Sequence, residues 1–409
     1  MVPPMSTVTS HDDLVYNPYA FATHDDPYVL YKRLRDEAPV WWNDDLKFWV
    51  ISRFTDVTEA FRDHETFCSR GGIALENRRP LGKVNPKFQQ MIELDPPEHT
   101  SFRRLVSRVF TQPKVIAMEA EIRGIIDGYI DRIIESGSGD LVADITGPFP
   151  MDVISAILGL PEHDRLMLRH HADSLLIRED GSMMMTKEGL DGMFALLEYF
   201  AADLARRRGE GGAGLITDLL DLEVEGRSLT EQELLGFCIL FVVAGHETTT
   251  KMVANAVEVL SRHPDQMAEL IADPSLIPGA IEEVLRYHPS TQYMVRTLTR
   301  DHELRGVKMR EGDSVLLLIG AANHDEREFG PTSEEFDIHR TPRHLAFGYG
   351  VHFCMGAALA RMEGKVALQQ ILSRLVDLRV DRARTERFHS GNVTGWVSLP
   401  ISFTPGAPL

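Results

Sequence analysis

The most informative part of this sequence is the stretch His344-Leu345-Ala346-Phe347-Gly348-Tyr349-Gly350-Val351-His352-Phe353-Cys354-Met355-Gly356. Its one cysteine, Cys354, stands in a glycine-punctuated loop and leads directly into a run of helical residues from Ala357 to Val376. A thiolate at the N-terminus of a helix faces unsatisfied N–H groups and the positive end of the helix dipole, so its negative charge is stabilised. The three glycines, Gly348, Gly350 and Gly356, are expected to take positive φ and to let the backbone approach a large flat partner.

A single cysteine presented in this way is suited to bind a metal. Backbone N–H groups aimed at the sulfur would moderate its electron density and so tune that metal. Haem iron accepts an axial thiolate, which makes haem the natural partner. A lone cysteine beside a glycine turn is more commonly a structural residue. The pattern Phe-Gly-x-Gly-x-His-x-Cys-x-Gly fixes six positions, however, and typical residue frequencies give a chance match of about 10⁻⁶ over a chain of this length.

This loop resembles the signature of the cytochrome P450 family of haem-thiolate monooxygenases. The resemblance implies a mainly α-helical fold with small β-sheets, shaped like a triangular prism with a long central helix over the haem. It also implies haem b as cofactor, with O2 as co-substrate and Cys354 as the axial ligand of the iron. The loop residues that would surround the cofactor are Phe347, Gly348, Gly350 and Gly356. The resemblance covers essentially the whole chain, as a single domain from 1 to 409 with a short flexible N-terminus of about residues 1–15.

The length, composition and net charge of the chain argue against several classes of protein. The chain has 409 residues, 43% of them hydrophobic, which suffices for a substantial core, and its net charge of -18 argues against nucleic acid as a partner. Three cysteines do not make a disulfide framework, which indicates a reducing cytoplasm. The segment from Met1 to Asp26 is acidic and has no apolar run, so we expect neither a signal peptide nor a membrane anchor. The sequence predicts a soluble, cytoplasmic, bacterial-type protein that is monomeric.

Hydrophobic periodicity predicts a largely helical chain. We expect helices at 26–38, 55–64, 100–110, 116–136, 150–159, 162–177, 187–208 and 278–288, and strands at 40–42, 48–52, 314–319 and 393–403. The segment Arg70–Lys87 is rich in Gly, Pro, Asn and Arg and should be a long, functional surface loop. The segment Arg178–Ser182 interrupts the helical pattern and is followed by three methionines, as expected for a mobile lid over an apolar cavity. A loose surface loop next to methionines of the core would explain the same pattern equally well.

The longest predicted helix begins at a capping box, Ser228-Leu229-Thr230-Glu231, and continues to His263. Its middle is almost wholly apolar from Phe237 to Ala244, so it must cross the interior. The polar stretch Ala244-Gly245-His246-Glu247-Thr248-Thr249 interrupts that middle. A threonine there can return its hydroxyl to a carbonyl one turn back, and Gly245 permits a local opening where water or dioxygen could fit.

The resemblance gives this polar stretch a catalytic role. Glu247 and Thr248 would form an acid–alcohol pair over the haem that manages protons and dioxygen, with Ala244 and Gly245 beside them. Cys354 would supply electron density from the opposite face. The alternative is a simple helix kink whose hydroxyl groups hydrogen-bond to carbonyls of the same helix. The presence of the cysteine loop weighs against this alternative.

Cations are needed for the haem propionates. His99 and Arg103 are one helical turn apart and can point at the same anion. By resemblance, Arg296 and His352 complete this set.

A structural ion pair is also implied. Glu283 and Arg286 are three residues apart on a predicted helix and can meet on one face. By resemblance they form a buried pair behind the haem, joined by a further arginine. Arg340 and Arg343 both remain candidates for that third place.

The resemblance places the substrate pocket among mainly apolar residues: Ile73, Leu75, Ile92, Leu176, Ile177, Val243, Ala244, Tyr293, Met294, Val295 and Val397. Such residues bind by hydrophobic burial, and each is equally suited to the core. Arg70, Arg78 or Arg79 could meet a substrate carboxylate. The expected substrate is a hydrophobic organic molecule, such as a steroid, terpenoid, fatty acid or polyketide, oxidised at a C–H bond with one atom of O2.

A basic cluster stands out in this acidic chain: Arg103, Arg104, Arg108, Lys114, Arg361 and Lys365. Charged patches mostly steer association, so we expect it to dock an acidic ferredoxin or a flavodoxin, supplied by an NAD(P)H-dependent reductase. Two alternatives remain. A peroxide-driven peroxygenase of the same fold would not need the pair Glu247 and Thr248, and a non-catalytic haem- or ligand-binding protein would need neither that pair nor the basic cluster.

Overall fold

The structure is a computed structural model that describes residues 14–83, 88–224 and 226–409. Its α-helices are α1 (Phe21–Asp25), α2 (Tyr28–Glu37), α3 (Phe54–Arg62), α4 (Glu98–Val109), α5 (Gln112–Ala117), α6 (Glu119–Asp131), α7 (Pro148–Leu158), α8 (Arg165–Leu176), α9 (Lys187–Glu210), α10 (Leu215–Leu220), α11 (Glu231–Arg262), α12 (Pro264–Ala272), α13 (Ile277–Tyr287), α14 (Ile319–Ala322), α15 (Glu326–Phe329) and α16 (Ala357–Arg374). The strands are β1 (Val40–Asn43), β2 (Phe48–Ile51), β3 (Phe67–Cys68), β4 (Ser138–Asp140), β5 (Met294–Leu298), β6 (His302–Leu304), β7 (Val307–Met309), β8 (Ser314–Leu317), β9 (Arg379–Val380), β10 (Glu386–Arg387), β11 (Trp396–Ser398) and β12 (Pro400–Ser402). Short helical turns are η1 (Leu75–Asn77), η2 (Met91–Glu93), η3 (Leu141–Thr146, a π-helical turn), η4 (Glu162–Asp164), η5 (Pro274–Leu276), η6 (Gly350–His352) and η7 (Arg382–Arg384).

The prediction of a mainly helical chain with small sheets is confirmed, and most predicted elements are present with ends shifted by a few residues. The helix expected at 116–136 is divided at Met118 into α5 and α6. Most of the predicted flexible N-terminus, and residues 84–87 of the predicted loop, lie outside the described residues. Within the described part, the one helical stretch long and apolar enough to cross a membrane is Leu141–Leu158, and 67% of it is buried inside the protein, as in a core helix.

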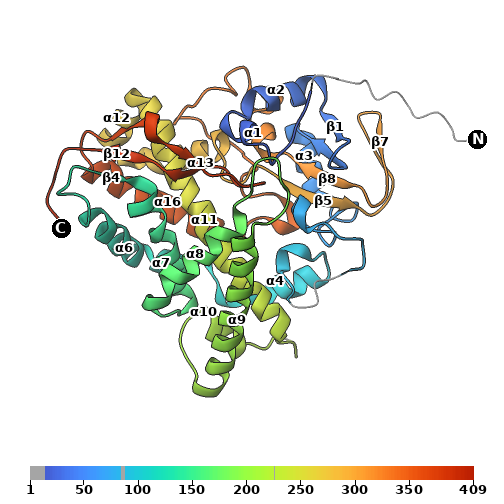
Figure 1. Ribbon diagram of the computed structural model, residues 1–409, viewed down its shortest axis with the longest axis horizontal. Coiled ribbons are helices and arrows are strands. Elements are labelled where there is room, and N and C mark those ends of the chain that lie inside the picture. Colours follow the sequence, from blue (N-terminus) through green and yellow to red (C-terminus); the bar gives the residue numbers. More distant parts are fainter. Residues whose placement is uncertain (1–13, 84–87, 225) are drawn as a thin grey trace, which may run out of the picture.

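The largest sheet joins distant parts of the chain in the order β1-β2-β8-β5-β3, with β2 and β8 parallel and the other pairs antiparallel. Side chains of β8 alternate between two core clusters: Val315 and Leu317 enter one, and Leu316 enters the other. Because both faces of the sheet are covered, β8 is a continuous apolar run. Figure 1 shows this sheet with α2 and α3 on one side of the molecule, and most helices gathered on the other.

The helix α11 runs through the middle of the molecule (Figure 1) and packs against α7, α8, α9 and α16. Its capping box lies two residues later than predicted. The Thr230 Oγ accepts a hydrogen bond from the Glu233 N–H at 3.2 Å, and the Glu233 carboxylate accepts one from the Thr230 N–H at 2.9 Å. Both Ser228 and Thr230 precede an acidic residue by three positions, and only the path of the preceding loop selects Thr230.

Candidate functional site

The cysteine loop presents its sulfur at the start of α16. The Cys354 thiol accepts hydrogen bonds from the backbone N–H groups of Gly356 and Ala357, and its own N–H donates to the Phe347 carbonyl at 2.9 Å. Burial raises the pKa of the Cys354 thiol, while these N–H groups and the charges of Arg103 and Arg361 oppose that rise. Of the three cysteines, Cys354 alone is exposed. The exposed Cys354 sulfur is therefore accessible to a ligand.

Two of the three loop glycines behave as predicted. Gly348 and Gly350 have φ of 67° and 70°, which favours glycine. A Cβ on Gly350 would lie 2.6 Å from the Phe61 carbonyl oxygen, so a larger residue would push the loop away from α3. The prediction for Gly356 is wrong, because its φ is -79°. A Cβ at this position would lie 3.8 Å from the Cys354 Sγ, an ordinary van der Waals separation, so the structure shows no steric need for glycine here.

The four predicted cations come together from three elements, α4, β5 and η6. The rings of His99 and His352 lie 4.1 Å apart. The Arg103 guanidinium donates to the Val351 and Phe353 carbonyls at 3.3 Å and 2.8 Å, and Arg296, on β5, donates to its neighbour Val295 at 2.8 Å. His352 also contacts the Ser69 hydroxyl at 3.1 Å, a partner that no sequence signal indicated.

The Asp95 carboxylate acts on His99 and Arg296 of this cluster but is itself paired with Arg70. Among the described residues, none of the four forms an ion pair, and both ring nitrogens of His99 are buried without a hydrogen-bond partner. Burial and the neighbouring Arg103 lower the pKa of His99 to about 4, and burial with Arg296 lowers that of His352 to about 2. Burial also lowers the pKa of Arg296 to about 10. At neutral pH the positive charge of the cluster therefore lies on Arg296, which is buried, and on Arg103, which is half-buried. A buried guanidinium without an ion-pair partner is costly, and together with the unpartnered His99 nitrogens it fits an anionic ligand such as the propionates of haem.

The surface of α11 at the polar stretch is accessible although the helix is interior. Ala244 is exposed and Thr248 is half-buried, and the Thr248 hydroxyl donates to the Ala244 carbonyl at 2.7 Å. The Ser290 hydroxyl donates to the Thr248 carbonyl at 2.8 Å and holds this turn in place. The local opening expected at Gly245 is not seen, because α11 is continuous there. A Cβ on Gly245 would lie 2.6 Å from the Ile154 side chain, so the glycine permits close packing of α7.

Glu247 points into the protein, with 3% of its side chain exposed. Its carboxylate pairs with the Lys251 ammonium at 3.0 Å and lies 3.8 Å from the His246 Nδ1. Burial alone would raise the pKa of Glu247, but Lys251 holds it below its usual value. Lys251 also donates to the Trp396 carbonyl at 2.7 Å and lies over the Phe388 ring. No role was predicted for this lysine, although its spacing of four residues from Glu247 was a usable signal.

The predicted ion pair is present and fully buried. The Arg286 guanidinium contacts both Glu283 oxygens at 2.7 Å, and both side chains are 0% exposed. The remaining donors of Arg286 reach the carbonyls of Asn323, Ser333 and Glu335. The third member is Arg340, whose Nε lies 3.2 Å from Glu283, whereas Arg343 is exposed and pairs with Glu328.

The predicted pocket residues divide into three groups. Leu75, Tyr293 and Val295 pack inside one core cluster of the large sheet. Those that remain half-buried are Ile73, Ile92, Leu176, Val243 and Met294. Ile177, Ala244 and Val397 are exposed. The C-terminal segment beside the lead into β5 is 392–394 rather than Val397, since the backbones of Gln292 and Ser290 pair with Asn392 and Thr394.

The predicted charged anchors are already engaged. Arg70 pairs with Asp95 at 2.8 Å and Arg79 pairs with Glu93 at 2.7 Å. The Arg78 guanidinium donates to the carbonyls of Leu75 and Lys47.

The predicted lid is held by specific contacts that the sequence did not indicate. Arg178 pairs with Glu76 at 2.7 Å, and Glu76 also accepts a hydrogen bond from the Tyr19 hydroxyl at 2.7 Å. The Gly181 N–H donates to the Tyr19 carbonyl at 2.9 Å, and Ile177 forms a β-bridge with Ser390. The segment is therefore fastened to the N-terminal and C-terminal parts of the chain in this structure.

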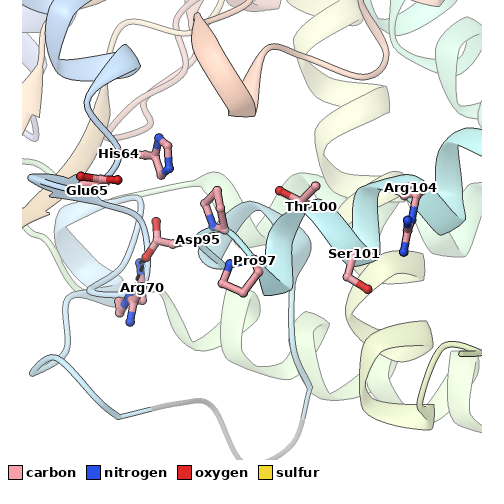
Figure 2. Close-up of a pocket in the computed structure, with 9 residues that line it drawn as sticks. His64, Glu65, Arg70, Asp95, Pro97, Thr100, Ser101 and Arg104 are labelled. Atoms are coloured by element: carbon pink, nitrogen blue, oxygen red, sulfur yellow. Dashed lines mark hydrogen bonds and ion pairs between the residues drawn. The ribbon is translucent and has the colours of Figure 1, made fainter.

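The basic cluster is less positive than the sequence suggested. Lys114 pairs with Asp218, Arg361 with Glu282, and Lys365 with Glu119. Arg104 and Arg108 remain exposed on α4. Figure 2 shows Arg104 at one end of a surface pocket of about 730 Å³, with His64, Glu65 and the pair Arg70–Asp95 at the other. The lining includes neither Cys354 nor Thr248, so this pocket is separate from the cysteine site.

Comparisons with known proteins agree with this geometry. The model of the family described as cytochrome P450 matches residues 270–390. The chain is 38% identical to the putative cytochrome P450 123 of Mycobacterium tuberculosis, over 97% of this chain and 99% of that protein. It is 36% identical to a steroid C26-monooxygenase of the same organism, over 93% and 94% of the two chains. The crystal structure of CYP109E1 from Bacillus megaterium in complex with testosterone superposes with a TM-score of 0.85 and 29% identity, covering 93% of this chain and 99% of that one.

Proposed function

Since this chain belongs to the cytochrome P450 family and is a monooxygenase, we propose that it inserts one oxygen atom from O2 into a C–H bond of a hydrophobic substrate of steroid type. The observation that carries this proposal is the accessible Cys354 thiol at the N-terminus of α16, close to Arg103 and to the unpartnered ring nitrogens of buried His99. We further propose that the whole chain acts as one domain in the cytoplasm.

The residues divide the work as follows. Cys354 would ligate haem iron, and His99, Arg103, Arg296 and His352 would hold the propionates. Haem, when bound, supplies the oxygen-activating chemistry. The N–H groups of Gly356 and Ala357 would moderate the electron density of the sulfur. Thr248 would hold a proton at its Oγ1 near the reacting oxygen, and Glu247 would pass protons toward it.

The steroid class is supported by two relatives, one named as a steroid C26-monooxygenase and one crystallised with testosterone. Half-buried apolar residues such as Ile73, Val243 and Met294 would favour a large apolar ligand. We expect a steroid added to the ferric holoenzyme to shift the haem from low to high spin in a saturable way. A saturable shift with long-chain fatty acids and none with any steroid would contradict the substrate class and leave the reaction class intact.

Replacing Thr248 by Ala is expected to uncouple the enzyme. Its hydroxyl is the side-chain donor on the exposed turn of α11, and losing a positioned proton donor costs roughly a hundredfold in the step it serves. We expect product per electron pair to fall steeply while NAD(P)H consumption continues and peroxide accumulates. The matched control is Thr250→Val, which removes a buried hydroxyl without a hydrogen-bond partner on the same helix. Coupling that stayed complete in Thr248→Ala would contradict the role of Thr248.

We propose a ferredoxin, or a flavodoxin, as the electron donor. The exposed Arg104 and Arg108 on α4 support an acidic partner. Reversing both charges with Arg104→Glu and Arg108→Glu should slow reduction by the partner about tenfold at low salt, and less at high salt. Stopped-flow reduction of the haem measures this rate. The control reverses two exposed lysines elsewhere, Lys32→Glu and Lys47→Glu, and an equal effect in both double variants would contradict docking at α4.

A further inference from the structure

Three side chains meet where α8 packs against α11. Asp173 comes from α8, and His246 and Glu247 come from α11. One carboxylate oxygen from each acid and one ring nitrogen of His246 all lie within 4.8 Å of one another. His246 is fully buried, and neither its Nδ1 nor the Oδ1 of Asp173 has a hydrogen-bond partner. Buried polar atoms that converge without partners require an explanation.

The hydrogen-bonding capacity of His246 explains why these polar atoms lack partners. Its Nε2 lies 3.0 Å from the Gly147 carbonyl oxygen, which can only accept, so the hydrogen is assigned to Nε2. In the neutral ring Nδ1 is then an acceptor. It faces the Asp173 Oδ1 at 3.4 Å and the Glu247 Oε2 at 3.8 Å. With both acids ionised, three acceptors would face one another with no donor among them. One additional proton in the cluster removes this conflict.

The surrounding charges indicate where that proton rests. Lys251 pairs with Glu247 at 3.0 Å and keeps it ionised, whereas Arg169 reaches Asp173 only at 3.6 Å. Burial, followed by the charge of Glu247, raises the pKa of Asp173 to about 8. Burial lowers the pKa of His246 to about 4. At neutral pH the proton therefore belongs to Asp173, with its acidic hydrogen facing His246 Nδ1.

Exposure gives the cluster a direction. The Asp173 Oδ1 that faces His246 is buried, but 31% of the side chain as a whole is exposed, so Asp173 can exchange protons with solvent. Glu247 is 3% exposed and adjoins Thr248. We propose that Asp173 and His246 are the loading end of a proton route that Glu247 and Thr248 complete. This inference rests on the roles proposed above for Glu247 and Thr248. The O–H bond of Asp173 breaks as an N–H bond forms at His246 Nδ1, and that bond breaks as Glu247 gains the proton. Asp173 then takes a proton from water, and no electrons move.

The first test does not depend on turnover. In the ferric holoenzyme, infrared difference spectroscopy should show a protonated carboxyl band that disappears as the pH rises through about 8. The substitution Asp173→Asn should remove this band. The fully buried Glu363, whose pKa burial also raises, provides a second carboxyl band that Asp173→Asn leaves in place. A spectrum unchanged by Asp173→Asn would overturn the proposal.

The second test uses substitutions that separate a proton role from a structural one. His246→Gln keeps a donor that can reach the Gly147 carbonyl and removes the Nδ1 acceptor. We expect Asp173→Asn and His246→Gln each to lower product per electron pair about tenfold and to enlarge the solvent isotope effect. In the wild type this coupling should fall as the pH rises through about 8, and Asp173→Asn should abolish that dependence. The control Asp191→Asn alters an exposed acid on α9 and should change nothing.

The outcomes are distinguishable from failure of the proposed function. Both variants should keep the haem content and the carbon monoxide spectrum of the wild type, whereas loss of that spectrum in the wild type itself would refute thiolate ligation. If His246→Gln kept the full yield of product per electron pair, His246 would have only a structural role, and the proposed proton route would be overturned. One equivalent of a non-iron metal bound to the wild type and lost in Asp173→Asn would also overturn it.

Discussion

Replacing Cys354 by Ala is expected to abolish the red-shifted Soret band that the reduced protein gives with carbon monoxide, and to reduce oxygen insertion to background. Cys354 is the exposed cysteine, and the N–H groups of Gly356 and Ala357 point at its sulfur. Alanine offers no ligand, so haem would be held only by the cations and by apolar contact. Difference spectroscopy and haem content measure the effect.

The control for this variant is Cys238→Ala. Cys238 is buried in α11, and burial raises its pKa far from that of a reactive thiol. We expect this variant to keep the full spectrum with at most a small loss of stability. An unaltered carbon monoxide spectrum in Cys354→Ala would refute the assignment of the ligand.

Replacing Glu283 by Gln is expected to cause the largest loss of stability, about 3–5 kcal/mol, because it leaves the buried Arg286 guanidinium without its counter-charge. Both side chains are 0% exposed, and Arg340 loses the same partner. The substitution preserves volume, so a packing defect contributes little. The midpoint of urea unfolding of the holoenzyme, followed by the Soret band, measures the loss.

The matched control is Arg343→Gln, the other arginine that the sequence allowed for this site. Its pair with Glu328 is largely exposed, so the expected loss is below about 1 kcal/mol. Equal losses in Glu283→Gln and Arg343→Gln would contradict the assignment of Arg340 as the third member.

The limits of sequence reasoning appear at particular residues. The positions of Cys354, Glu247 and Glu283 were readable because each lies in a short pattern in which neighbours along one helix or loop carry the signal. The third arginine of the ion-pair cluster could not be predicted, because the sequence does not distinguish Arg340 from Arg343. Only the path of the loop decides that Arg340 reaches Glu283. The charged anchors proposed at Arg70 and Arg79 are engaged by Asp95 and Glu93, from a different segment. Which charged residues from distant segments become partners depends on the tertiary path of the chain, and local sequence patterns do not encode that path.

The amino-acid sequence by itself indicated the family and the long helix through the interior, and it predicted Cys354 as the thiolate ligand and Glu247 and Thr248 as an acid–alcohol pair. These features depend on spacing within one element, where backbone geometry fixes which side chains are neighbours. Only the tertiary structure decided that the ring nitrogens of His99 are buried without partners, which arginine joins Glu283, and that Asp173 meets His246 and Glu247. Those contacts join elements far apart in the chain, so their burial and charge balance exist only after packing has excluded water from them.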